Sequence, residues 1–158
     1  MVKKRTSRII SYGGIGAIAA LVTFMVLLQA QNAKNNQFRK SIDGIASDAV
    51  ALTQEYQAEE SKWSNKQYSN STMITIVDNF LPKYQELIDR ANTLDTPDRY
   101  RESRALLVSA IESEKESNEH FRNYLASGNQ TEYHQSSNLL TRSLTESANY
   151  DAAIRAAG

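Results

Sequence analysis

The spacing of apolar residues in two long stretches most constrains what this chain can fold into. From Phe38 to Tyr56 the apolar residues follow one another at steps of 4, 3, 4, 3 and 4, and from Met73 to Leu94 the same two steps alternate. These steps keep side chains on one face of an α-helix. The residues predicted to face a helical core are Phe38, Ile42, Ile45, Ala49, Leu52, Tyr56, Met73, Val77, Phe80, Tyr84, Leu87, Ala91 and Leu94.

Few glycines or prolines interrupt the chain after residue 30, which favours long helices and excludes a turn-rich β fold. Short connections make successive helices antiparallel, so the predicted fold is all-α, with an up-down-up-down four-helix bundle. Pro82 lies inside the second helix and is expected to kink it or split it near Phe80. Polar connectors and capping residues place the four helices at residues 31–63, 72–94, 97–127 and 130–156.

The second half of the bundle has a more polar set of inward positions. Six of the eight tyrosines in the chain lie at or beside predicted inward positions, and a buried tyrosine needs a partner for its hydroxyl. We therefore expect a wet core, or a surface completed by another protein. The inward residues predicted for the third helix are Tyr100, Leu107, Ala110, Ile111, Phe121 and Tyr124, and those for the fourth are Tyr133, Leu140, Leu144, Tyr150 and Ile154.

An uncharged apolar run at residues 9–28 precedes the bundle. As a helix its 20 residues rise roughly 30 Å, the thickness of the hydrocarbon core of a bilayer. The sequence therefore predicts a single N-terminal transmembrane signal-anchor helix at residues 9–29, between a basic N-terminus at residues 1–8 and a helical domain at residues 30–158. The first helix of the bundle can continue from this span as one rod.

Charge predicts the orientation of this span. Lys3, Lys4, Arg5 and Arg8 lie directly before it, whereas the basic residues after it are fewer and farther away. The positive-inside rule then predicts a single-pass membrane protein with a cytoplasmic N-terminus and an extracytoplasmic C-terminal domain. The alternative is a signal peptide cleaved near Ala30, which would export the same domain.

The partners predicted from the sequence are the membrane and another protein chain. Gly13 with Ala17 and Gly16 with Ala20 are pairs of small residues four apart, a spacing that lets a second membrane helix approach closely. A protein partner or a homo-oligomer could thus form through these residues and the bundle surface, although glycine and alanine are also simply common in membrane helices. Without the first eight residues, 14 basic residues face 18 acidic ones, a net charge of −4 that argues against nucleic acid.

Two histidines suggest a metal site. His120 and His134 fall at similar heights on helices three and four, and Glu116 lies one turn before His120. Histidine and carboxylate on facing helices are the ligands with which bundles hold metals. The Glu-x-x-His spacing of di-iron bundles is absent, and ordinary solvated histidines are the alternative.

Three other polar features are weaker signals. The stretch Glu112, Glu114, Glu116 and Glu119 is the densest in acids, and it is interpreted as a solvated helix face. Asn70 and Asn129 each begin an Asn-x-Thr sequon in a predicted loop, so they are candidate glycosylation sites.

No residue in the sequence is a candidate for catalysis or cofactor binding, so an enzyme is not expected. Over roughly residues 36–156 the predicted architecture resembles the extracytoplasmic four-helix bundles of bacterial and archaeal receptors. Those receptors return through the membrane, whereas no second apolar run occurs here, so a stand-alone transducer is not expected. The sequence favours a membrane-tethered interaction or accessory subunit of a membrane or cell-surface assembly. The alternative is an extracytoplasmic bundle that binds a metal or small ligand, secreted after cleavage near Ala30.

Overall fold

The computed structural model describes the backbone of residues 6–158 and the side chains of residues 29–158. In the described part the chain is helical, and no strand occurs. The chain divides into two compact units, Met1–Gln37 and Phe38–Gly158. The prediction of an all-helical bundle is confirmed for the second unit. The helices are α1 (Thr6–Ser64), α2 (Asn70–Asn92), the short 3-10 helix η1 (Asp98–Tyr100), α3 (Arg101–Ser127) and α4 (Gln130–Ala157).

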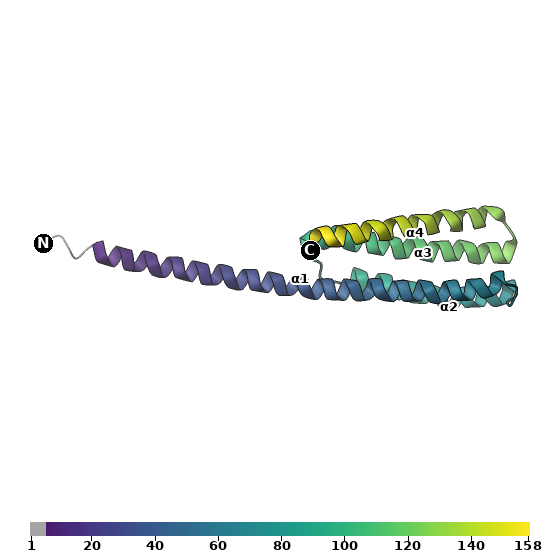
Figure 1. Ribbon diagram of the computed structural model, residues 1–158, viewed down its shortest axis with the longest axis horizontal. Coiled ribbons are helices and arrows are strands. Elements are labelled where there is room, and N and C mark those ends of the chain that lie inside the picture. The colour runs from purple at the N-terminus through teal and green to yellow at the C-terminus, as the bar shows by residue number, and fades with distance from the viewer. Residues whose placement is uncertain (1–5) are drawn as a thin grey trace. The chain divides into compact units, whose positions relative to one another are not determined.

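Within Phe38–Gly158, consecutive helices run in opposite directions, and the α3–α4 hairpin lies beside α1 and α2 (Figure 1). Aromatic contacts mark the two ends of this unit. At one end Phe38 stacks on Tyr100, with ring centroids 5.1 Å apart. At the other end the rings of Trp63 and Phe121 meet edge to face at 5.2 Å. The first contact joins α1 to η1 and the second joins α1 to α3.

The core forms where the apolar spacing of α1 and α2 predicts it. Every predicted inward residue of these two stretches is buried except Leu94, which packs at the edge of the core. Burying an aliphatic or aromatic side chain of this kind stabilises a fold by about 1.5–3 kcal/mol. The 4–3 spacing of the sequence is therefore the main reason that α1 and α2 pair.

Capping contacts mark three helix ends, whereas α3 begins at Arg101 rather than at the predicted residue 97 and has no side-chain cap. Ser69 precedes α2, and its hydroxyl accepts a hydrogen bond from the backbone N–H of Thr72 at 3.1 Å. Gly128 ends α3 in the left-handed region with φ of 72°, and the side chain of Asn129 caps α4 by accepting from the N–H of Thr131 at 3.0 Å. These caps satisfy backbone groups that the helices themselves leave unpaired.

The split expected at Pro82 does not occur. Asn70–Asn92 is one helix with Pro82 inside it. Proline lacks the N–H that would bond to the carbonyl of Asp78, but both residues lie on the exposed side of α2. Water can therefore solvate the free carbonyl, which limits the cost of the proline.

Helix α4 packs by a different face from the one that the sequence predicts. Of its predicted inward residues, Tyr150 and Ile154 are buried, but Tyr133, Leu140 and Leu144 are exposed. The face turned inward in the first half of α4 includes Ser136, Leu139, Ser143 and Glu146 instead. This stripe is displaced by one residue from the predicted one, which is about 100° around a helix axis. The prediction was wrong because the inward stripe is largely polar.

No helix among the residues with described side chains is long and apolar enough to cross a membrane. The predicted span at residues 9–29 falls almost entirely outside those residues, as do the small residues Gly13, Gly16, Ala17 and Ala20. The backbone of α1 runs without a break from Thr6 to Ser64. The membrane span and its orientation therefore stay predictions.

Candidate functional site

A groove lies between α1 and α4 in the helical unit. It holds about 360 Å³. The α1 side spans Ala46 to Gln57, the floor comes from Leu107, Ala110 and Ile111 of α3, and Leu140 and Leu144 of α4 form the other wall. At one end the hydroxyl of Tyr150 donates to Asp43 Oδ1 across the two helices at 3.4 Å. The volume lies in the range of sites that bind ligands or side chains of a partner.

The rims of this groove are unusually apolar. Four large hydrophobic side chains are exposed among residues 29–158, and three of them line it: Val50 at 58%, Leu140 at 39% and Leu144 at 65%. Single exposed apolar residues are ordinary on protein surfaces, but a cluster around one depression marks an interaction site. The displaced packing of α4 creates this cluster, because it turns both leucines away from α3.

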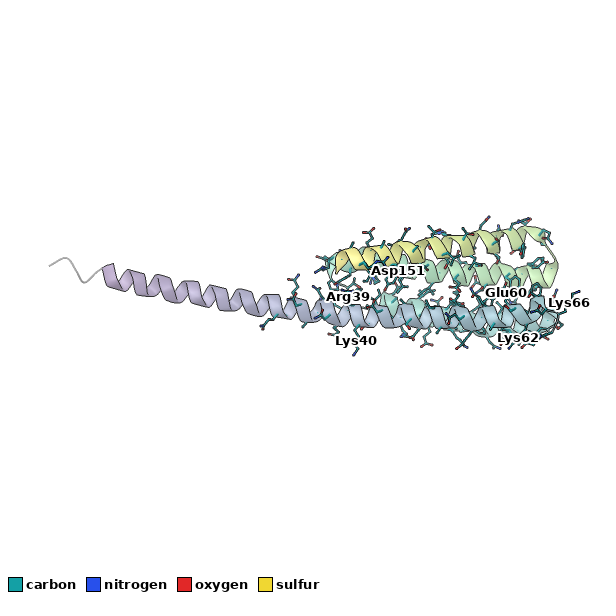
Figure 2. All side chains as sticks on the ribbon, viewed as in Figure 1. Arg39, Lys40, Glu60, Lys62, Lys66 and Asp151 are labelled. Atoms are coloured by element: carbon teal, nitrogen blue, oxygen red, sulfur yellow. The ribbon has the colours of Figure 1, made fainter. Side chains whose placement is uncertain are left out.

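Two carboxylates also line the groove, Glu114 and Asp151. Glu114 is half-buried, and Tyr84 donates its hydroxyl to Glu114 Oε1 at 3.0 Å. Burial raises the pKa of Glu114 above its ordinary value, and the bond from Tyr84 offsets part of this effect. Figure 2 shows Asp151 on α4, near the end of the bundle where Arg39 of α1 lies. The interpretation of Glu114 as part of a solvated face is therefore wrong, although Glu112 and Glu116 are exposed.

A polar layer lies beneath this carboxylate. The hydroxyl of Tyr56 and the amide nitrogen of Asn118 are buried without a hydrogen-bond partner. Burial raises the pKa values of the Tyr56 and Tyr84 hydroxyls, so both stay protonated near neutral pH. Burial likewise raises the pKa of Glu60, which lies near Tyr56. Tyrosine, amide and carboxyl groups thus lie inside the bundle, and the expected hydration of the core stays a prediction.

A hydrogen-bonded seam holds α4 on α3. Glu146 accepts from Ser109 Oγ at 2.8 Å and from Ser113 Oγ at 2.9 Å, and Arg142 donates to it from the same helix at 2.9 Å. One helical turn after Ser113 in α3, Ser117 Oγ donates to the backbone oxygen of Ser136 at 2.8 Å. Burial alone would raise the pKa of Glu146, but the three donors outweigh it and hold the pKa below its ordinary value. The seam replaces the apolar contact that the sequence predicts here.

The candidate metal residues do not come together as one cluster. His120 is half-buried, and its Nδ1 lies 2.7 Å from Glu132 Oε2, whose pKa this hydrogen bond lowers. His134 is exposed and has its ring 6.2 Å from that of Tyr133, and Glu116 is also exposed. Within residues 29–158, no group of three or more histidine or acidic side chains could hold a metal ion. The site at His120, His134 and Glu116 stays an untested prediction.

Known proteins offer no likeness from which a function could be transferred. No family model, no curated protein and no solved structure matches this chain. A function for it therefore has to rest on its own residues.

Both sequon asparagines lie at helix starts rather than in open loops. Asn70 is the first residue of α2, and it accepts from Trp63 Nε1 at 2.9 Å and donates to the backbone oxygen of Leu125 at 3.2 Å. Asn129 is the N-cap of α4. Each side chain therefore already has a structural role, and glycosylation at either position stays a prediction.

The residues that make the groove and the seam carry only a faint signal in the sequence. Ser109, Ser113 and Ser117 of α3 lie four apart, and Ser136 and Ser143 of α4 lie seven apart. Small polar residues at helical spacing on two neighbouring helices can indicate a polar interface. That signal competes with the stronger hydrophobic signal of Leu140 and Leu144, which favours the opposite assignment.

Proposed function

We propose that this protein is a membrane-tethered interaction protein. In this proposal residues 9–29 anchor the chain, and the helical unit binds another protein on the extracytoplasmic side. The uncharged run and the basic residues before it support the anchor and its orientation. The anchor also limits the search of the helical unit for its partner to the membrane surface.

The observation that carries the binding role is the groove between α1 and α4. Three of the four large hydrophobic side chains exposed in residues 29–158 surround it. Covering a fully exposed side chain of this size contributes about 1.5–3 kcal/mol to association, and a partly exposed one contributes less. A partner that fills the groove would remove three of the four large exposed hydrophobic side chains of residues 29–158 from water.

Cysteine accessibility tests the anchor and its orientation, since the natural chain has no cysteine. A single cysteine is placed either at Ser64, at the end of α1, or at Ser7, before the apolar run. In intact cells a membrane-impermeant maleimide should label Ser64→Cys and leave Ser7→Cys unlabelled until the membrane is opened. The full-length protein should sediment with membranes. Recovery in the soluble fraction, or labelling of both positions in intact cells, would contradict the proposal.

Co-purification tests the binding role. The full-length protein and its Leu144→Gln variant are purified side by side from native membranes. The natural protein should retain a protein that the variant loses, because glutamine places a polar group on the apolar rim. If the two preparations retain the same proteins, the groove is not the binding surface.

A further inference from the structure

We infer that the α1–α4 groove binds a basic amphipathic helix of a partner protein. This inference rests on the proposed binding role and names its partner. The apolar side of such a helix would cover Val50, Leu140 and Leu144, and its lysine or arginine side chains would reach Glu114 and Asp151.

The shape of the groove fits a helix better than a small molecule. Along α1 it extends from Ala46 to Gln57, eleven residue steps, or about 16 Å, which is the length of about three helical turns. A small ligand on the floor would leave the side chains of Val50 and Leu144 on the two rims in water. A helix lying along the groove would cover both, as in the helix-in-groove mode of recognition.

Small residues make the approach of a helix feasible. Ala46 and Ala49 of α1, Ala110 of α3, and Ser143 and Ser147 of α4 all line the groove. Side chains of this size allow the backbone of an incoming helix to come close, so that its larger apolar residues can fill the space. The groove is thus lined by small side chains, with the larger apolar side chains of Val50 and Leu144 at its two rims.

The negative charge of the groove favours a positively charged partner. Both charged residues that line it, Glu114 and Asp151, are acidic. The nearby basic side chains lie elsewhere, since Arg142 pairs with Glu146 on the seam with α3, and Arg39 of α1 is not part of the lining. A cation near Glu114 would also compensate the burial of its carboxylate. An acidic helix would meet repulsion from both carboxylates, which gives the groove a preference in sign.

Two designed peptides test this inference. Each is a helix of about 14 residues built from leucine, alanine and one charged residue type, lysine in one peptide and glutamate in the other. The full-length chain carries Ser147→Cys, labelled with an environment-sensitive fluorophore, and is held in nanodiscs of zwitterionic lipid. The lysine peptide should change the fluorescence and bind at least about tenfold more tightly than the glutamate peptide, with an affinity that falls as salt rises. The control places the label at Thr75→Cys on the exposed side of α2, where no change is expected.

Variants separate the apolar and the charged contributions. Leu144→Gln should weaken the binding of both peptides. The double variant Glu114→Gln, Asp151→Asn should remove most of the difference between the lysine and glutamate peptides and flatten the salt dependence. Equal binding of both peptides by the natural protein would overturn the preference for a basic partner. Absence of binding by either peptide would overturn the docking of a helix.

Two further results would assign the groove to a different occupant. If the natural protein is a dimer and Leu144→Gln is a monomer, a second copy occupies the groove and the inference is wrong. If a small molecule co-purifies and blocks the label at Ser147→Cys, the groove is a small-ligand site and the inference is likewise wrong. A soluble full-length protein would contradict the anchor alone, because the peptide assay then runs in buffer and keeps its meaning.

Discussion

At the scale of single residues, the bundle contains two half-buried carboxyl groups whose pKa values shift in opposite directions. Glu114 has its pKa raised by burial, whereas Glu146 has its pKa held below the ordinary value by three donors. Linkage between protonation and folding gives the two groups opposite effects on stability. Above its raised pKa, Glu114 is ionised in a half-buried position, which lowers the stability of the fold. Glu146 contributes stability above the ordinary carboxyl pKa, and this contribution is lost as the pH falls through its lowered pKa.

Replacement of Glu114 by glutamine should raise the Tm at pH 7 by a few degrees, because each kcal/mol is worth about 2–4 °C in a domain of this size. Glutamine keeps an acceptor for the hydroxyl of Tyr84 and removes the charge. The gain should shrink towards pH 3, below the ordinary carboxyl pKa, where the natural carboxyl is protonated in the folded and unfolded states alike. Thermal unfolding followed by circular dichroism across this pH range measures the effect. Glu112→Gln, at an exposed position of the same helix, should show no such gain.

Replacement of Glu146 by alanine should destabilise the fold by about 1–3 kcal/mol at pH 7, because the hydroxyls of Ser109 and Ser113 lose their acceptor. The loss should be smaller below the lowered pKa of Glu146. Chemical denaturation at two pH values measures it. Arg142→Ala removes only the exposed partner in the ion pair and should change stability by less than about 1 kcal/mol. Equal effects of the two variants would show that the serine bonds contribute little.

At the scale of helices, the hydrophobic spacing predicts most of the fold. The core faces of α1 and α2 and the turn at Gly128 follow from single-helix patterns and cap chemistry, whereas the 3-10 helix before α3 moves its start from the predicted residue 97 to Arg101. The face of α4 does not follow from such patterns, because its position depends on hydrogen bonds between Glu146 and serines more than 30 residues away. The hydrophobic pattern of a single helix reflects only how apolar each residue is, and it contains no information on hydrogen bonds to another helix. The groove escapes prediction for the same reason, since it exists only once α4 has packed by its polar stripe.

Alanine substitutions on α4 distinguish the observed face from the predicted one. Leu144 is 65% exposed and Ile154 is 7% exposed. Leu144→Ala should therefore change the free energy of unfolding by about 0.5 kcal/mol or less, whereas Ile154→Ala should cost about 2–4 kcal/mol. Chemical denaturation of both variants provides the comparison. A loss of several kcal/mol for Leu144→Ala would place that leucine in the core.

Two glycines should respond to alanine with opposite signs. Gly128 ends α3 with φ of 72°, where an alanine is strained although no atom lies within 4 Å of its Cβ, so Gly128→Ala should cost about 1 kcal/mol. Gly44 lies inside α1, and the space that an alanine methyl group would fill there is open, so Gly44→Ala should stabilise by about 0.5–1 kcal/mol. Thermal unfolding of both variants gives the signs directly. A loss of stability in both would mean that α1 near Gly44 needs the flexibility of glycine.

At the scale of the whole molecule, the stability of the bundle resides in the second compact unit. Among residues 29–158, every residue of the buried apolar cluster lies at Phe38 or beyond. The second unit thus has an apolar core of its own, to which residues 29–37 contribute no member. This division fits the proposed roles of binding for one part and anchoring for the other.

Deletion of residues 1–29 should leave the bundle folded. We expect residues 30–158 to keep their helical circular dichroism and to melt within about 2 °C of the full-length protein, because the deletion retains every described residue of the apolar core. The same deletion should release the protein from membranes if residues 9–29 are the anchor. A large fall in Tm would show that the N-terminal segment supports the bundle.

The thin apolar contact of α4 has a consequence for motion. Three residues of α4 are buried, compared with seven in α2, and serine and glutamate bonds complete its attachment to α3. Water can replace such bonds one by one, so we expect α4 to open locally more readily than α2. If α4 moves away from α3, the wall of the groove that Leu140 and Leu144 form would move with it. A partner too large for the groove as observed could bind while α4 is displaced. The return of α4 to its place would then slow the dissociation of that partner.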